Sequence, residues 1–130
     1  MIRSRPIAAP RPVRGAAAAR LRQRRLARLA ALQIPADGLP GSLALTHTRC
    51  GKPTCHCAAA DDPGHPGWQL GFRVAGRTRV ERIPAEWAEE VRRRVEAGRA
   101  FQEAVAEVFA LNAELLVLER RQRRSGARGR

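Results

Sequence analysis

The apolar residues near the N-terminus recur at helical spacing. Residues 16–33 consist largely of alanine, arginine, leucine and glutamine, which favour helices, and their apolar side chains fall on one stripe. The stripe consists of Ala18, Leu21, Leu29 and Leu32. Arg25 also falls within it, so we expect its aliphatic stem to lie along the apolar surface. The other faces carry arginine, which suits either a helix that contacts an anionic partner or a docking helix with a solvated outer face.

The middle of the chain alternates apolar and polar residues, as β-strands do. The expected strands are residues 42–49, 68–75 and 77–83. The last two form a hairpin that turns at Gly76. Trp68 and Phe72 share one face of this hairpin, and we assign them to core packing rather than to base stacking. A small three-stranded antiparallel sheet is therefore expected.

A long helix follows the predicted sheet. Pro84 suits the first turn of a helix, and from Ala85 to about Arg121 the chain contains one glycine, Gly98, and no proline. Its seam consists of Trp87, Val91, Arg94/Val95, Gly98, Phe101, Val105, Val108, Asn112 and Leu115. A helix of about 55 Å is too long for so small a core. It must bend near Gly98 into a helical hairpin, pair with the N-terminal helix, or dimerise. Asn112 either fixes the register of this seam or faces solvent at a bend.

All three cysteines lie within ten residues. They are Cys50, Cys55 and Cys57, in the spacing C-x4-C-x-C, and His65 follows the last of them. An odd number of thiols, with no secretory signal before them, does not suit a disulfide framework. Thiolates beside an imidazole suit Zn2+, which takes four tetrahedral ligands, and a closed Cys3His shell is a structural site. We therefore predict a structural zinc knuckle; inert buried thiols, redox thiols and a nucleophilic cysteine are the alternatives.

The fourth ligand has three histidine candidates. If Cys55 and Cys57 are extended, their side chains point to the same side and that of His56 points to the other, which favours His65. His47 is the second candidate because it precedes the first cysteine by only three residues.

These elements predict an α+β protein with an N-terminal helix, a three-stranded antiparallel sheet with a zinc knuckle, and a long C-terminal helix or bent helical hairpin. With three Phe, two Trp and no Tyr, its core is modest, so a metal staple would help it. We expect residues 1–15 to be a disordered basic arm, residues 16–118 a single zinc-stapled domain, and residues 119–130 a disordered basic tail.

The net charge of +13 is concentrated at the two ends. Residues 1–33 carry nine arginines and no acid, whereas residues 34–118 carry ten basic and eleven acidic residues. Basic arms on a neutral body attract polyanions, so we expect nucleic acid as the partner, DNA rather than RNA; arms that only solubilise the protein are the alternative. The predicted phosphate contacts at the ends are Arg20, Arg22, Arg24, Arg25, Arg28, Arg120, Arg121, Arg123 and Arg124. A second candidate surface, on the hairpin, consists of Arg73, Arg77, Arg79 and Arg82.

Enzymatic chemistry has little support in the sequence. A catalytic zinc needs an open position and a nearby base, and Asp61 and Asp62 lie in a Pro/Gly-rich loop that is typical of solvated turns. There is no His/Glu pair at zincin spacing and no Gly-rich phosphate loop. There is no apolar run of about 18 residues either, so we expect no transmembrane helix and no membrane partner. Three thiols and a metal site indicate a reducing compartment, so we expect a cytoplasmic protein. The rival to nucleic-acid binding is a protein–protein adaptor or homodimer that uses the long helix.

The middle of the chain resembles a family of small bacterial and archaeal proteins of unknown function, often encoded near transposases. The family pattern runs "PGSL", "CGKxxCxC", "HGPYYxL", "GKTRxxxVP" and "LNxELL". The matching segments are Pro40-Gly41-Ser42-Leu43, Cys50-Gly51-Lys52-Pro53-Thr54-Cys55-His56-Cys57, Gly76-Arg77-Thr78-Arg79, Ile83-Pro84 and Leu111-Asn112-Ala113-Glu114-Leu115-Leu116. The family's His-Gly-Pro-Tyr-Tyr is His65-Pro66-Gly67-Trp68 here, with glycine and proline exchanged. The resemblance implies the same fold and an accessory role in a mobile element, but no activity.

Overall fold

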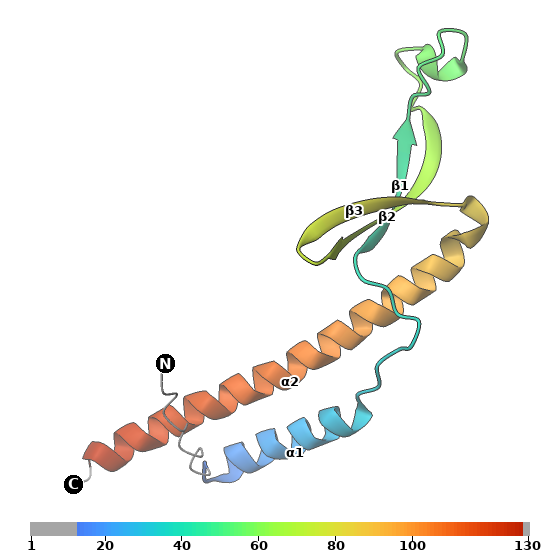
Figure 1. Cartoon of the computed structure of the whole chain (residues 1–130). Coiled ribbons are helices and arrows are strands. Elements are labelled where there is room, and N and C mark those ends of the chain that lie inside the picture. The colour runs from blue at the N-terminus through green and yellow to red at the C-terminus, as the bar shows by residue number, and fades with distance from the viewer. Residues whose placement is uncertain (1–12, 129–130) are drawn as a thin grey trace, which may run out of the picture. The chain divides into compact units, whose positions relative to one another are not determined.

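The computed structural model describes residues 13–128 (Figure 1). The elements follow the order α1 (Ala16–Ala31), β1 (Ser42–Thr48), the 3₁₀ turn η1 (His56–Ala58), β2 (His65–Val74), β3 (Arg77–Ile83), the 3₁₀ turn η2 (Ala85–Trp87) and α2 (Ala88–Arg128). The strands form one antiparallel sheet in the order β1-β2-β3. The predicted α+β architecture, with an N-terminal helix, a three-stranded sheet and a long C-terminal helix, is therefore confirmed.

The chain divides into two compact units, where the sequence suggested one domain over residues 16–118. Among the described residues, the first unit, here the helical unit, contains residues 13–32 and 104–128. The second, here the sheet unit, is Gln33–Glu103. The helix α2 contributes to both. Residues 1–12 of the expected basic arm lie outside the described residues.

The core of the sheet unit lies between one face of the sheet and the first turns of α2. Leu70, Val91 and Val95 are buried there. Partly buried side chains around them are Leu39, Leu43, Phe72 and Ile83. The register places Leu43 opposite Leu70, so both side chains lie on the same face of the sheet. The apolar residues of the predicted alternating pattern therefore lie on this covered face, and the residues between them lie on an open face.

β2 begins three residues earlier than the sequence predicted, at His65. Pro66 lies within this extension, although proline cannot donate a hydrogen bond to a neighbouring strand. Here it pairs only with β1, opposite His47, because the pairing between β2 and β3 begins at Trp68. Pro66 therefore lies in the part of β2 that pairs with one neighbouring strand, so its missing N–H disrupts no pairing with β3.

Gly98 lies within α2 at a close approach of the preceding loop. A Cβ atom at this position would lie 2.4 Å from the carbonyl oxygen of Leu39. The loop is held there because the N–H of Leu39 donates to the carbonyl of Arg94 (3.0 Å), and the Arg94 side chain donates to the carbonyl of Asp37 (2.8 Å). Arg93 completes the contact with an ion pair to the Asp37 carboxylate (2.7 Å). α2 is one helix from Ala88 to Arg128, so the bend near Gly98, one of the three alternatives, does not occur, and Gly98 instead provides room for this loop.

The helical unit pairs α1 with the second part of α2, which is one of the three arrangements that the sequence allowed. Its buried residues are Ala18, Val108, Leu111 and Leu115. Asn112 is exposed, and its side-chain oxygen accepts a hydrogen bond from Arg25 (3.0 Å). Arg28 forms an ion pair with Glu107 (3.1 Å). The arginine inside the apolar stripe of α1 and the asparagine inside the seam of α2 are therefore partners.

α2 continues through most of the segment that was expected to be a disordered tail from residue 119. Arginine, glutamine and glutamate favour helices, and Arg123 forms an ion pair with Glu119 one turn earlier (2.7 Å). Neither helix contains, among the described residues, a stretch that is both long and apolar enough to cross a membrane.

Replacing Gly98 with alanine is predicted to destabilise the protein. Helix propensity alone would favour alanine by about 1 kcal/mol, but the new Cβ meets the Leu39 carbonyl, and overpacking of this kind costs about 1–3 kcal/mol. The matched control is Gly126→Ala, also in α2, where a Cβ meets open space. Chemical denaturation followed by circular dichroism gives both free energies of unfolding. A Gly98→Ala protein as stable as Gly126→Ala would contradict the close approach.

Candidate metal centre

The three cysteines lie in the loop between β1 and β2, drawn in green in Figure 1. Pairing of Thr48 with His65 closes the base of this loop, and His65 is therefore the first residue of β2. One donor atom from each of four residues lies within 4.8 Å of the other three. The four residues are Cys50, Cys55, Cys57 and His65. The structure thus brings together the four residues that the sequence singled out, and they could hold a metal ion.

The donor atoms are close enough to share one ion. The Sγ atoms of Cys50 and Cys57 are 3.4 Å apart, and the Cys55 Sγ is 3.2 Å from the His65 Nε2. Two donors bound to one tetrahedral zinc ion are about 3.5–3.8 Å apart. Only a few tenths of an ångström therefore separate these two pairs from the spacing of a zinc site. Cys57 is buried, Cys55 and His65 are half-buried, and Cys50 is exposed.

The backbone reaches this arrangement in a way that the sequence did not predict. Cys55 and Cys57 are not part of an extended segment, because the 3₁₀ turn η1 begins directly after Cys55. The N–H of Cys55 donates to the carbonyl of Lys52 (3.1 Å) and closes the preceding turn. The extended geometry used to favour His65 is therefore wrong, although His65 does lie with the three cysteines.

The other two histidines do not join the cluster. The His56 ring is exposed, and its Nδ1 lies 2.9 Å from a carboxylate oxygen of Asp62. Its centroid is 4.8 Å from that of His65 in an edge-to-face arrangement, so it packs against a candidate ligand. His47 is exposed on β1. Of the three histidines, His65 alone has a ring nitrogen among the grouped donors.

Arg49 organises the loop around the cysteines. Its guanidinium donates hydrogen bonds to the carbonyl oxygens of Cys57, Ala59 (2.8 Å) and Asp62 (2.9 Å). One side chain thereby fixes the backbone on the C-terminal side of η1 relative to the end of β1. In the sequence, only the position of an arginine directly before the first cysteine indicates this role.

Asp62 is not the solvated turn residue that its setting suggested. One carboxylate oxygen faces His56, and the other accepts a hydrogen bond from the N–H of Gly64 (2.8 Å). The hydrogen bond with His56 and then that from Gly64 lower the pKa of Asp62. Because the pKa is lowered on folding, this carboxylate stabilises the loop at neutral pH, and the effect is lost as the pH falls through that lowered value.

Gly64 is required for the return of the chain to β2. It is buried, its φ is 97°, and a Cβ atom would lie 2.9 Å from the carbonyl oxygen of Thr48. Both the left-handed backbone and the close approach to β1 exclude a larger residue. His65, the next residue, is thereby placed beside the end of β1.

The thiols of the cluster differ in acidity. The N–H of Lys52, followed by contacts with Cys57 and His65, lowers the pKa of Cys50 to about 6. The N–H of Cys50 lowers the pKa of Cys57, but burial and the neighbouring sulfurs raise it more, so its net shift is upward. Metal ligands must be thiolates, and Cys50 reaches this form readily at neutral pH. A divalent cation would relieve the repulsion that opposes ionisation of Cys57.

The predicted arginines of α1 fall into two groups. Arg22, Arg25 and Arg28 are occupied within the helical unit: Arg22 donates to the carbonyl of Val13 (2.7 Å), and the other two bind Asn112 and Glu107. Arg20 and Arg24 instead line a groove, together with Arg121 from α2. On α2, Arg123 pairs with Glu119, while Arg120 and Arg124 are exposed.

The predicted arginines of the hairpin lie on opposite faces of the sheet. Arg79 is opposite Phe72, on the covered face, where its guanidinium lies over the Phe72 ring and pairs with Glu81 (2.6 Å). Arg77 is two residues before Arg79 in β3, so its side chain lies on the same, covered face. Arg82 is opposite Gln69 and Arg73 is opposite Thr78, so these two arginines belong to the open face.

Arg49→Ala is predicted to weaken metal binding by about 10- to 100-fold, because groups that orient the ligands commonly contribute this much to affinity. The matched control is Lys52→Ala, in the same loop, whose side chain is exposed and whose backbone N–H is retained. Competition for Zn2+ with a chromophoric chelator measures both affinities. Equal affinities of the two variants would contradict the role given to Arg49.

Comparison with known proteins places residues 16–93 within a family. No curated protein and no solved structure matches the chain. Residues 16–93 match the family model described as a domain of unknown function, DUF6788. This range contains α1, the whole sheet and all four residues of the candidate metal centre, and it ends in the second turn of α2. Because the match covers more than half of the chain, the protein belongs to the DUF6788 family.

Proposed function

We propose that this protein is a small zinc-binding protein that contacts nucleic acid, and that the zinc ion is structural. The observation that carries the metal assignment is the gathering of three thiols and one imidazole within 4.8 Å. This donor set is typical of Zn2+, since magnesium and calcium prefer oxygen ligands and iron–sulfur clusters usually take four cysteines. An imidazole at hydrogen-bond distance (3.2 Å) from the Cys55 sulfur also suits a reactive thiol, but the grouping of all three sulfurs with this one ring nitrogen favours a shared metal ion.

The position of the four residues supports a structural role. Cys50 lies two residues after β1, His65 begins β2, and the other two cysteines lie in the loop between them. An ion bound to all four would tie both strand ends to the loop. Four protein ligands leave no open position for substrate, and Asp62 is already bonded to His56 and Gly64. We therefore propose a non-enzymatic protein.

The expected result for the purified protein is one zinc ion per chain. Chelation is predicted to lower the melting temperature by about 10 °C or more, since a loss of about 2 kcal/mol shifts a domain of this size by that amount. Cys57→Ser and His65→Ala should bind zinc weakly or not at all, whereas His56→Ala should retain it. Elemental analysis and thermal melting with and without chelator measure these effects. A metal-free protein whose melting is unchanged by zinc and by chelator would overturn the proposal.

The open face of the sheet is the surface that supports nucleic-acid binding. Arg73 and Arg82 lie on it, with small or polar neighbours such as Gly71, Thr46 and Gln69. The one acidic residue of the three strands, Glu81, is opposite Leu70 and so belongs to the covered face. An acid-free face with two guanidinium groups on rigid strands favours phosphate contacts. The exposed Arg120 and Arg124 on α2 would add contacts that carry no sequence information. The mobile-element setting rests on the family resemblance alone.

Binding to duplex DNA is predicted to fall log-linearly with salt, and Arg73→Gln/Arg82→Gln should reduce the slope by about 2, the value for two lost phosphate contacts. The matched control is Arg77→Gln/Arg79→Gln, which removes the same charge from the covered face of the same hairpin. Fluorescence anisotropy with a labelled duplex, titrated over salt on the zinc-loaded proteins, gives the slopes. Equal effects of the two double variants would show that the open face is not the contact surface.

A further inference from the structure

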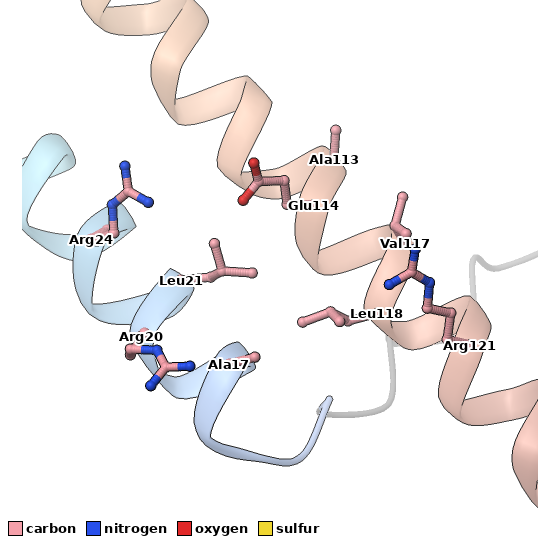
Figure 2. A pocket seen from close by; sticks show the side chains of 9 residues that line it. All are labelled: Ala17, Arg20, Leu21, Arg24, Ala113, Glu114, Val117, Leu118 and Arg121. Atoms are coloured by element: carbon pink, nitrogen blue, oxygen red, sulfur yellow. The ribbon is translucent and has the colours of Figure 1, made fainter.

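The helical unit contains an open groove between α1 and α2, with a volume of about 590 Å³ (Figure 2). The two helices run antiparallel, as the pairs Arg25–Asn112 and Arg28–Glu107 require. The groove is lined by apolar residues from both helices, and Leu21 and Leu118 point toward one another across it (Figure 2). The other apolar lining residues are Ala17, Ala113 and Val117. These five apolar residues form the floor of the groove, on a helix pair whose other exposed residues are rich in arginine.

The apolar surface extends beyond the groove. Val117 is 47% exposed, and its neighbour Leu116 is 64% exposed. Phe109, two turns earlier on α2, is 65% exposed. Two helices cannot enclose a core by themselves, and a contiguous apolar surface on such a pair is typical of a docking site for another element.

The rim of the groove is basic. It carries Arg20 and Arg24, which are one turn apart on α1, and Arg121 on α2, against a single carboxylate, Glu114. Within residues 13–128, none of these three arginines has a hydrogen bond or an ion pair to another side chain, in contrast to Arg25 and Arg28. The guanidinium groups are therefore available on both sides of an apolar floor.

We propose that this groove binds an amphipathic helix of a partner protein, with an apolar face flanked by Asp or Glu. The apolar face would lie on Leu21 and Val117 as a third helix packed on two, and carboxylates one turn apart would meet Arg20 and Arg24. Arg121 would meet an acidic residue on the other flank. Charge complementarity of this kind selects the partner more than it adds affinity.

Other occupants suit the groove less well. A second copy of the chain would bring its own arginines against this rim, and residues 1–12 of the same chain contain three arginines and no acid. The phosphates of a nucleic acid would meet the rim, but the apolar floor offers a nucleic-acid backbone no partner. An amphipathic acidic helix can pair its carboxylates with the arginines of the rim and pack its apolar face on the apolar lining.

The test uses the zinc-loaded full-length protein and three designed peptides of about 20 residues that share one Leu/Ala face. Their flanking positions carry Glu, Gln or Lys. We expect the Glu peptide to bind about tenfold more tightly than the Gln peptide, and the Lys peptide not to bind. Fluorescence anisotropy of the labelled peptides gives the affinities, and added salt should reduce the difference between the Glu and Gln peptides.

Variants distinguish this groove from general electrostatic attraction. Arg20→Glu/Arg24→Glu should reverse the preference toward the Lys peptide. The matched control is Arg120→Glu/Arg124→Glu, which applies the same charge change at the same spacing on α2 but outside the groove, and should retain the preference for Glu. Val117→Glu should weaken binding of all three peptides at unchanged helical content.

Three outcomes would overturn the proposal. The Glu and Gln peptides could bind equally, or the control pair could reverse the preference as strongly as the groove pair. Sedimentation could also show a dimer of the full-length chain that Val117→Glu dissociates, which would assign the groove to a second copy. If Val117→Glu loses its helical content, the reversal by the charge variants still decides.

Discussion

The sheet unit depends on the cysteine loop between β1 and β2 keeping one conformation, although this loop has almost no apolar core of its own. Between the end of β1 and the start of β2, the buried residues are Cys57 and Gly64. Backbone contacts made by Arg49 and Asp62 fix the loop from outside, but they leave four soft donors gathered at its centre. Thiolates this close repel one another unless a cation lies among them. A bound metal would therefore replace the missing apolar core of the loop.

The two faces of the sheet differ in chemistry. The face with Leu70 and Phe72 packs on α2, where the backbone contact between Leu39 and Gly98 fixes the approach of the chain to the helix. The opposite face carries arginine without an acid. A helix packed on one face, together with a metal ion if one binds at the end of β1 and β2, would keep the open face rigid. Rigid guanidinium groups lose less entropy on contact with phosphate than those on a flexible arm do.

Much of the fold could be predicted from local pattern, because hydrophobic periodicity and proline or glycine positions act within one element. Cysteine spacing likewise predicted the cluster. The predictions that were wrong concern places where segments far apart in the sequence contact one another. The 3₁₀ turn at Cys57 depends on contacts with Arg49, and the role of Gly98 depends on Leu39, which is 59 positions earlier in the sequence. The split of the hairpin arginines between the two faces could not be predicted. A turn at Gly76 alone would pair Arg73 with Arg79 on one face, whereas the turn comprises Ala75 and Gly76 and pairs Arg73 with Thr78.

The two surfaces of this protein differ in how they relate to the family. All four candidate ligands and the open face of the sheet lie within the matched residues 16–93. The α2 wall of the groove, from Ala113 to Arg121, lies beyond that range. The groove is therefore half built from a segment that the family model does not describe, and that segment carries one of the three rim arginines, Arg121. The candidate metal centre therefore lies within the part of the chain that the family model describes, whereas the α2 wall of the groove lies outside it.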